Sequence, residues 1–438
     1  MRSIAWIVAA LLALPPQGGV TTPQSLPGTA PLDWEGDLST RMMDGLHRFA
    51  ENKIARSAEG RGAYWRRDPS SPESYARSIE PNRARFARML GLVDPRLPAR
   101  LERFGDEPGG ALAAETAQFR AYQVRWPVLE GVEGEGLLLE PRHAPVGHVV
   151  ALPDADQTPE QLAGLAPGID PAAQFARRLA SGGFRVIVPT LVDRADTWSG
   201  NPAVGFTNQP HREWIYRQAY HMGRHILGYE AAKALSAADW LRARAGSGAK
   251  VGVAGYGEGG LIAFYASAAV TGIDACLVSG AFAPEERPWE EPLYRNLFGL
   301  LGEFGAAEVA SLIAPRGLVV EYSPFPGVSG PPAPRPGRRG AAPGALATPP
   351  LGAVAAEFQR IDRLVPAGLG KRFLVSAPGG APVRPGSREA LLRFAELLGA
   401  RPAWTEPAAA PVDRRRAFDP AARQERQVRQ LEAHVQRL

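Results

Sequence analysis

The chain has 438 residues, of which 45% are hydrophobic and 22% charged; these values are typical of globular proteins and exclude a disordered or fibrous chain. The net charge of +5 is small for this length, and the arginines are scattered among acidic residues, which argues against a nucleic-acid-binding protein. Such a length favours one large domain with extensions. The single cysteine, Cys276, lies in an apolar run and is interpreted as a buried, inert thiol.

Residues 1–22 have the pattern of a secretory signal peptide. A short polar start with Arg2 precedes the apolar run from Ile4 to Leu14, which is too short to span a bilayer. We therefore expect a secreted or periplasmic protein, cleaved between Leu14 and Thr22. Retention of the segment as an N-terminal membrane anchor is the alternative.

Residues 23–118 are expected to form a tail and a helical extension. Apolar residues recur at helical spacing from Met42 to Ile54. A second helix is predicted within Pro72 to Leu92, where Pro81 bends or splits it. These helices are expected to cap or support the main domain.

Residues 119–400 are predicted to form an α/β domain. Alternation around Tyr122 to Trp126, a glycine-rich turn and the run Leu137 to Leu139 indicate an antiparallel pair. Apolar runs then alternate with helical patterns, which favours a doubly wound, mostly parallel sheet. The further strands expected are His148 to Leu152, Arg185 to Val188, Val251 to Ala254, Ala275 to Val278, Gly317 to Tyr322 and Phe373 to Val375. The expected helices are Pro171 to Ser181, Glu213 to Arg244, Gly260 to Ala269, Leu293 to Ile313, Val354 to Leu364 and Ser387 to Leu398.

Two segments rich in proline and alanine interrupt this pattern. Ser323 to Leu351 is predicted to be an extended surface loop. In the last region, residues 401–438, a linker precedes a charged helix that runs to Leu438 without a C-terminal cap. We expect this terminal helix to pack on a partner chain or on a catalytic module after Leu438.

The segment Val251 to Gly260 reads VGVAGYGEGG. A strand, a glycine-spaced turn and a buried helix form the context of the G-x-S-x-G nucleophile elbow, but Gly257 stands in the place of the serine. Glycine relieves the strain of that turn and removes the nucleophile. Glu258 follows, at the position whose N–H serves the oxyanion hole, and its side chain is expected to cap the next helix.

Ligands of an open parallel sheet bind outside the carboxyl ends of its strands. The loops after the expected strands carry acidic residues there, and one of these loops runs on to His211. A carboxylate in such a place could act as a general base. The catalytic candidates are Asp154, His211 and Glu258, and the ligand-binding candidates are Asp156, Gln157, Asp193, Trp198 and Tyr256.

A complete serine triad cannot be assembled from the sequence. No histidine occurs in the loop Ser376 to Ser387, and no acidic residue occurs between Tyr322 and Glu357, where the order serine, acid, histidine requires them. A carboxylate-activated water, or Ser199 paired with His211, is the alternative for an active hydrolase. No metal-binding spacing such as H-E-x-x-H occurs, and we expect neither a metal nor a cofactor.

Several aromatic residues and histidines have two interpretations. Trp198 and Trp214 could form a sugar-stacking platform, although such residues more often pack in a core. His221 and His225 are spaced to share one face of a helix and are interpreted as packing or solvated residues.

The span from about Tyr122 to Leu398 resembles the α/β-hydrolase superfamily, in particular its acetyl-xylan-esterase-like and dienelactone-hydrolase-like branch of secreted bacterial proteins. The elbow Gly255 to Gly260 carries the resemblance, together with Arg212 to Tyr220 leading to Ala237-Ala-Asp-Trp-Leu241. The resemblance implies an α/β-hydrolase fold and an ester-cleaving ancestry on acylated carbohydrate. With Gly257 at the position that matches the serine, we expect a degenerate site that binds an acylated carbohydrate or a small ester, or a partner module.

Overall fold

The computed structural model describes residues 25–105, 110–200, 208–246, 248–284, 287–334, 336–337, 339–404 and 409–438. The predicted signal peptide lies outside these residues. The chain divides into two units, Met1–Lys53 and Ile54–Leu438. The first predicted helix is α1 (Leu38–Gly60), of which no described residue is buried. No helix in the described ranges is long and apolar enough to cross a membrane.

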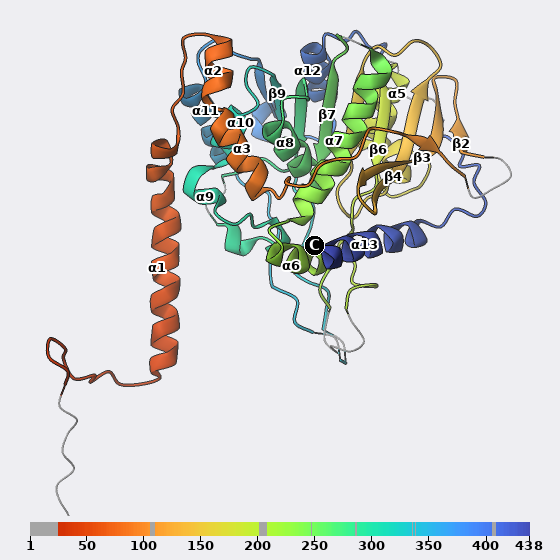
Figure 1. Ribbon diagram of the computed structural model, residues 1–438. Helices are drawn as coiled ribbons and strands as arrows, with labels where there is room; N and C mark the ends of the chain where they lie inside the picture. The colour runs from red at the N-terminus through yellow and green to blue at the C-terminus, as the bar shows by residue number, and fades with distance from the viewer. Residues whose placement is uncertain are drawn as a thin grey trace, which may run out of the picture. The chain divides into compact units, whose positions relative to one another are not determined.

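A ten-stranded sheet forms the centre of the second unit, with the strand order β1-β3-β4-β6-β5-β7-β8-β9-β10 and β2 beside β3 (Figure 1). The six strands β5 to β10 run parallel to one another. Strands β3 and β4 are antiparallel to their neighbours. The predicted mostly parallel α/β sheet is therefore confirmed. Its strands are β1 (Glu102–Arg103), β2 (Leu112–Glu115), β3 (Phe119–Leu129), β4 (Val132–Pro141), β5 (His148–Leu152), β6 (Arg185–Pro189), β7 (Val251–Tyr256), β8 (Ala275–Ser279), β9 (Gly317–Glu321) and β10 (Arg372–Val375).

Helices cover both faces of this sheet. One face packs against α3 (Glu80–Met89), α7 (Ile226–Ala245) and α8 (Glu258–Ala269), and the other against α5 (Phe175–Ser181) and α12 (Arg388–Leu398) (Figure 1). Successive side chains of a strand point to opposite faces, so in β5 Val150 belongs to the first core and Val149 to the second. Burial on both faces explains why these strands are apolar throughout.

The long helices predicted from the sequence are broken in the structure. The segment predicted from Glu213 to Arg244 forms α6 (His211–His221) and α7, and the Nδ1 atom of His225 accepts the Leu227 N–H at 3.1 Å as the N-cap of α7. His221 and His225 therefore do not share a helix face. The predicted segment Pro171 to Ser181 forms the 3₁₀ helix η2 (Pro171–Ala173) and α5, and Leu293 to Ile313 forms η4 (Leu293–Arg295), α9 (Leu300–Glu303) and α10 (Ala306–Ser311). The segment Pro72 to Leu92 is split near Pro81 into α2 (Pro72–Ser78) and α3, as predicted. The segment Val354 to Leu364 lies in one unbroken helix, α11 (Leu351–Leu364).

The C-terminal helix α13 (Pro420–Arg437) packs on its own domain, along β4 and α6 (Figure 1). Val428, Leu431 and Val435 are buried. Arg423 forms two hydrogen bonds, at 2.9 and 2.7 Å, with the carboxylate of Glu160 in α4 (Pro159–Ala163). Val428, Leu431 and Val435 of α13 are thus covered by this chain itself, and packing of a partner chain or a further module on this helix stays a prediction.

Candidate functional site

The carboxyl ends of β5 and β7 form the topological switch point of the sheet. From β5 the chain crosses to β6 on one side and then returns to β7 on the other side of β5. Ligand sites of open α/β sheets lie at such a point. Asp154 follows β5 and Gly257 follows β7, so the topology places these two sequence-predicted positions side by side.

The turn at Gly257 has the backbone conformation of a nucleophile elbow. Its φ and ψ are 58° and −122°, a region in which any residue with a side chain is strained. The flanking glycines are required by close packing: a Cβ on Gly255 would lie 2.1 Å from the Gly259 carbonyl oxygen, and one on Gly259 would lie 2.2 Å from that of Pro153. The strand, turn and helix of an elbow are therefore present.

The space of a nucleophile side chain is filled by other residues. A Cβ on Gly257 would lie 2.4 Å from Asp154 Oδ1 and 2.5 Å from Pro326 Cγ. Asp154 Oδ1 also accepts the Glu258 N–H at 2.9 Å, which in this fold is an oxyanion-hole donor. Asp154, and not the Glu258 side chain as expected, therefore caps α8.

Arg194 pairs with Asp154 in a bidentate manner. Its Nη1 lies 2.6 Å from Asp154 Oδ2 and its Nη2 lies 3.0 Å from Oδ1. Burial alone would raise the pKa of the Asp154 carboxyl, but the hydrogen bonds and charge of Arg194 outweigh it and hold that pKa below its usual value. Burial likewise acts to lower the pKa of Arg194, and pairing with Asp154 raises it instead. Asp154 is therefore held as a carboxylate.

Glu258 extends this pairing into a cluster. Its Oε2 lies 3.2 Å from Arg194 Nη2, and its Oε1 lies 3.3 Å from Arg212 Nη2. Arg212 in turn pairs with Glu230 at 2.7 Å. The side chains of Arg212, Glu230 and Glu258 are fully buried. We call these five residues, Asp154, Arg194, Arg212, Glu230 and Glu258, the switch-point cluster.

His211 lies in a separate arrangement. Its Nδ1 is 2.6 Å from Asp193 Oδ1, and its Nε2 accepts the Trp198 N–H at 2.9 Å. The Trp198 ring stacks on the imidazole, with 5.1 Å between ring centroids. Both ring nitrogens are thus occupied, so the arrangement leaves no free nitrogen for Ser199 or for a water, and one face of Trp198 is covered. Trp214 is directed elsewhere, because its Nε1 donates to Glu432 of α13.

The remaining candidates support the loop after β5 or flank the elbow. Gln157 Oε1 accepts the Asp154 N–H at 3.2 Å. Asp156, whose side chain is 53% exposed, accepts from Arg194 Nη1 at 3.0 Å. Tyr256 ends β7, and burial raises its pKa to about 12, so its hydroxyl stays protonated at neutral pH.

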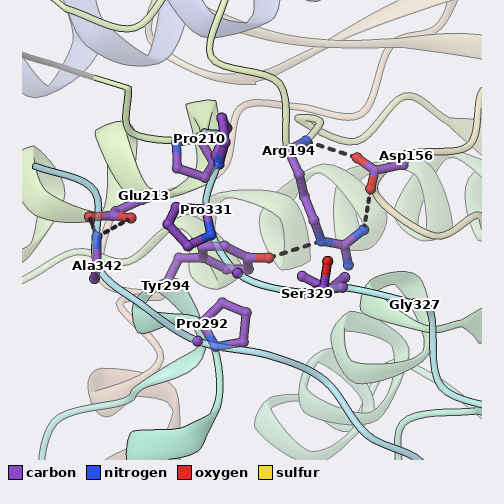
Figure 2. A pocket seen from close by; sticks show the side chains of 14 residues that line it. Asp156, Arg194, Pro210, Glu213, Pro292, Tyr294, Gly327, Ser329, Pro331 and Ala342 are labelled. Carbon is purple, nitrogen blue, oxygen red and sulfur yellow. Dashed lines mark hydrogen bonds and ion pairs between the residues drawn. The ribbon is translucent and has the colours of Figure 1, made fainter. Parts of the chain in front are cut away.

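A small cavity of about 260 Å³ opens over Arg194. Figure 2 shows Asp156 and the Tyr294 hydroxyl bonded to Arg194, and Glu213 accepting the Ala342 N–H. Residues 327–332 of the predicted surface loop also line the cavity. The charged groups drawn there are paired within the protein, so the cavity offers a small ligand few unpaired charges. Within the described ranges, no group of three or more His, Cys, Asp or Glu is placed to hold a metal ion.

Sequence reasoning missed Glu321, the last residue of β9. Its buried carboxylate accepts the N–H groups of Gly386 and Ser387 at 2.8 and 2.7 Å, and burial raises its pKa. It therefore fastens the loop in which a catalytic histidine was sought. The one sequence feature that could have indicated its role is its position as a single acidic residue at the end of the apolar strand β9.

The arginines of the switch-point cluster were also missed, as was Glu230. A carboxylate within the otherwise apolar first turns of α7 is the signal for Glu230, because an acidic residue is almost never fully buried without a partner. Nothing in the sequence distinguishes Arg194 or Arg212 from the many exposed arginines.

One protein-family model matches part of this chain. Residues 135–288 match the model of the dienelactone hydrolase family, a segment that contains both strands of the switch point. No curated protein is similar in sequence to this chain. A putative acetyl xylan esterase from Bacteroides fragilis is 14% identical, with 78% of this chain and 88% of that chain covered and a TM-score of 0.49.

Two further solved structures are similar at the same level. A glucuronoyl esterase from Solibacter usitatus is 14% identical, with 75% and 94% of the two chains covered and a TM-score of 0.46. Acetyl xylan esterase 1 from Thermoanaerobacterium is 12% identical, with 76% and 96% covered and a TM-score of 0.44. The sheet and its elbow, together with the match over residues 135–288, give this chain an α/β-hydrolase fold, and that segment is similar to the dienelactone hydrolase family.

Proposed function

We propose that this protein is a relative of carbohydrate esterases that does not hydrolyse esters but still binds a ligand. The ligand would bind at the sheet edge formed by the loops after β5 and β7, around Asp154 and Gly257, which we call the elbow edge. The contact of the Asp154 carboxylate with the Glu258 N–H, at 2.9 Å, carries the proposal. Ester hydrolysis requires a nucleophile and donors aimed at the developing oxyanion. Here Gly257 has no side chain that could act as the nucleophile. The Glu258 N–H, which would donate to the oxyanion, already donates to the Asp154 carboxylate.

The alternative, a carboxylate that activates water, is less well supported. A general base needs a free lone pair and a pKa near the working pH. Asp154 Oδ1 accepts from Glu258 N–H and Arg194, and Oδ2 accepts from Arg194 and, at 3.3 Å, from the Asp156 N–H. Its lowered pKa makes it a weak base.

Ester cleavage is tested with p-nitrophenyl acetate and acetylated xylan, on the purified mature chain beside Asp154→Ala. We expect no turnover above buffer and no labelling by a serine-directed fluorophosphonate. Asp239→Ala, which removes a 48% exposed aspartate, is the matched control. Turnover that Asp154→Ala loses and Asp239→Ala keeps would establish a carboxylate-dependent hydrolase and refute the proposal.

The ligand class proposed for the elbow edge is an acylated carbohydrate or a small ester. The resemblance to carbohydrate esterases motivates it, and the cavity of about 260 Å³ beside Arg194 and Tyr294 supplies polar lining. Calorimetric titration with acetylated xylo-oligosaccharides tests it, with Asp156→Ala as the variant expected to weaken binding. Equal heats for acetylated and deacetylated oligosaccharides would contradict recognition of the acyl group.

Export is the remaining part of the proposal and rests on the sequence of residues 1–22 alone. We expect mature chains to begin between residues 15 and 23. N-terminal sequencing of the protein from cytoplasmic, periplasmic and culture fractions tests this. Full-length chains in the membrane fraction would instead support the anchor.

A further inference from the structure

A second cavity, of about 890 Å³, lies beside α8 and has no lining residue in common with the small cavity over Arg194. Its volume is in the range of about 300–1,000 Å³ that is usual for small-molecule sites. Most of its lining is apolar and comes from α8, the segment around α9, the loop before α11 and α11 itself. Representative lining residues are Leu261, Tyr265, Leu297, Leu300, Phe325 and Ala353.

Arg295 is a charged group in the wall of this cavity. Its side chain is only 5% exposed. Within the part of the chain that the structure describes, neither its Nε nor its Nη1 forms a hydrogen bond. These buried N–H groups have ion-pair partners but no aligned hydrogen bond, so this guanidinium gains from a ligand acceptor that is better placed.

The carboxylates near Arg295 differ in how firmly they are held. Glu258 lies 3.9 Å from its Nε and is engaged by Arg194 and Arg212. Glu291 lies 3.1 Å from its Nη1, and its side chain is 35% exposed. Glu291 can therefore move into solvent at little cost, whereas Glu258 cannot.

We propose that this cavity binds an amphiphilic carboxylate, in which an apolar chain fills the cavity and one carboxylate replaces Glu291 on Arg295. A guanidinium and a carboxylate form paired, charge-assisted hydrogen bonds, and the apolar wall accepts the rest of the molecule. This inference goes beyond the proposed function and does not depend on it, because the cavity would hold such a molecule whether or not the elbow cleaves esters.

Calorimetric titration of the mature chain with octanoate, decanoate and dodecanoate, below their micelle concentrations, tests the apolar part. Each buried methylene is expected to tighten binding about fourfold. Ala353→Phe, which places a ring in the cavity, is expected to abolish binding. No binding of any of the three by the unmodified chain would overturn the proposal.

Two charge variants test the head group. Glu291→Gln removes the competing carboxylate and is expected to tighten dodecanoate binding severalfold, whereas Arg295→Gln is expected to weaken it at least tenfold. Glu389→Gln is the matched control, since Glu389 is an exposed glutamate of α12 that does not line the cavity, and it should leave the affinity unchanged.

Dodecanol is the neutral comparison ligand and is expected to bind at least tenfold more weakly than dodecanoate. Equal affinities for the two, or no tightening in Glu291→Gln, would overturn the role of Arg295. Should Arg295→Gln fail to fold, Glu291→Gln alone decides. The titrations report on this cavity and the ester assays on the elbow, so failure of one proposal is distinguishable from failure of the other.

Discussion

Two buried arginine–carboxylate clusters in this protein use the same chemistry in different places. In the switch-point cluster Arg194 donates two hydrogen bonds to the Asp154 carboxylate, at 2.6 and 3.0 Å. Beside α13, Arg423 donates two hydrogen bonds to the Glu160 carboxylate, at 2.9 and 2.7 Å. In both, burial would raise the pKa of the carboxyl, but the arginine outweighs burial and lowers it.

The clusters differ in what else the carboxylate touches. Asp154 accepts the N–H of Glu258 and occupies the space beside Gly257, whereas Glu160 receives a second arginine, Arg415, at 3.2 Å and fastens the C-terminal segment. A buried, ion-paired carboxylate is thus an ordinary structural device here. Its position on an oxyanion donor, and not its pKa, gives Asp154 a functional meaning.

The largest difference between the clusters is expected on removing one arginine from each. Arg194→Met leaves Asp154 and Glu258 short of a buried counter-charge, and breaking a buried pair costs about 3–5 kcal/mol. Arg423→Met should cost clearly less, because Arg415 still pairs with Glu160. Urea unfolding at pH 7 measures both. Equal losses would mean that Arg415 gives no support.

A pH effect is expected where α13 meets α7. Lys233 is fully buried and donates to Gln427 of α13, and burial lowers its pKa to about 8, against about 10.4 in an unfolded chain. Between these values the unfolded state binds more protons, so stability should rise with pH by up to about 1.4 kcal/mol per unit.

Lys233→Met should remove this rise, and Lys250→Met, at an exposed lysine, should keep it. Unfolding free energies measured from pH 7.5 to 10.5 give the comparison. A rise that persists unchanged in Lys233→Met would show that another group is responsible.

The filled space at the elbow predicts a smaller effect. Gly257→Ser places a Cβ against Asp154 and Pro326, and overpacking of this kind costs about 1–3 kcal/mol. Gly223→Ser is the matched control, because Gly223 also has a positive φ, of 67°, but nothing lies within 4 Å of its Cβ position. Equal thermal midpoints for the two variants would show that the elbow has room for a serine. The serine variant is also expected to remain without esterase activity.

The parallel core could be predicted because its strands are apolar on both faces. His148 to Leu152 and Val251 to Ala254 were placed within two residues of β5 and β7. The strands β1 (Glu102–Arg103) and β2 (Leu112–Glu115) were missed, since they are two and four residues long and lack an alternating pattern. The break before α7 was missed because a histidine N-cap is a weak signal.

The site could be predicted only in outline. The position of Gly257, and of Asp154 after β5, follows from the order of strands and loops. The pairing could not be predicted, because Arg194 comes from one loop, Arg212 from α6 and Glu230 from α7. Only tertiary structure brings them together, and an arginine that becomes buried by such pairing resembles an exposed one in sequence.

The most direct test of the central claim is to empty the place that Asp154 occupies. Asp154→Gly should leave the Glu258 N–H and Arg194 without their carboxylate, so formate should bind there and raise the unfolding midpoint with increasing concentration. Asp156→Gly, which removes the exposed partner of Arg194, is the matched control, and chloride keeps the ionic strength constant.

We predict that formate stabilises Asp154→Gly and leaves the unmodified chain and Asp156→Gly unchanged in urea unfolding at pH 7. A folded Asp154→Gly protein that is indifferent to formate, or an unmodified chain that formate stabilises equally, would contradict the claim that Asp154 occupies the oxyanion position.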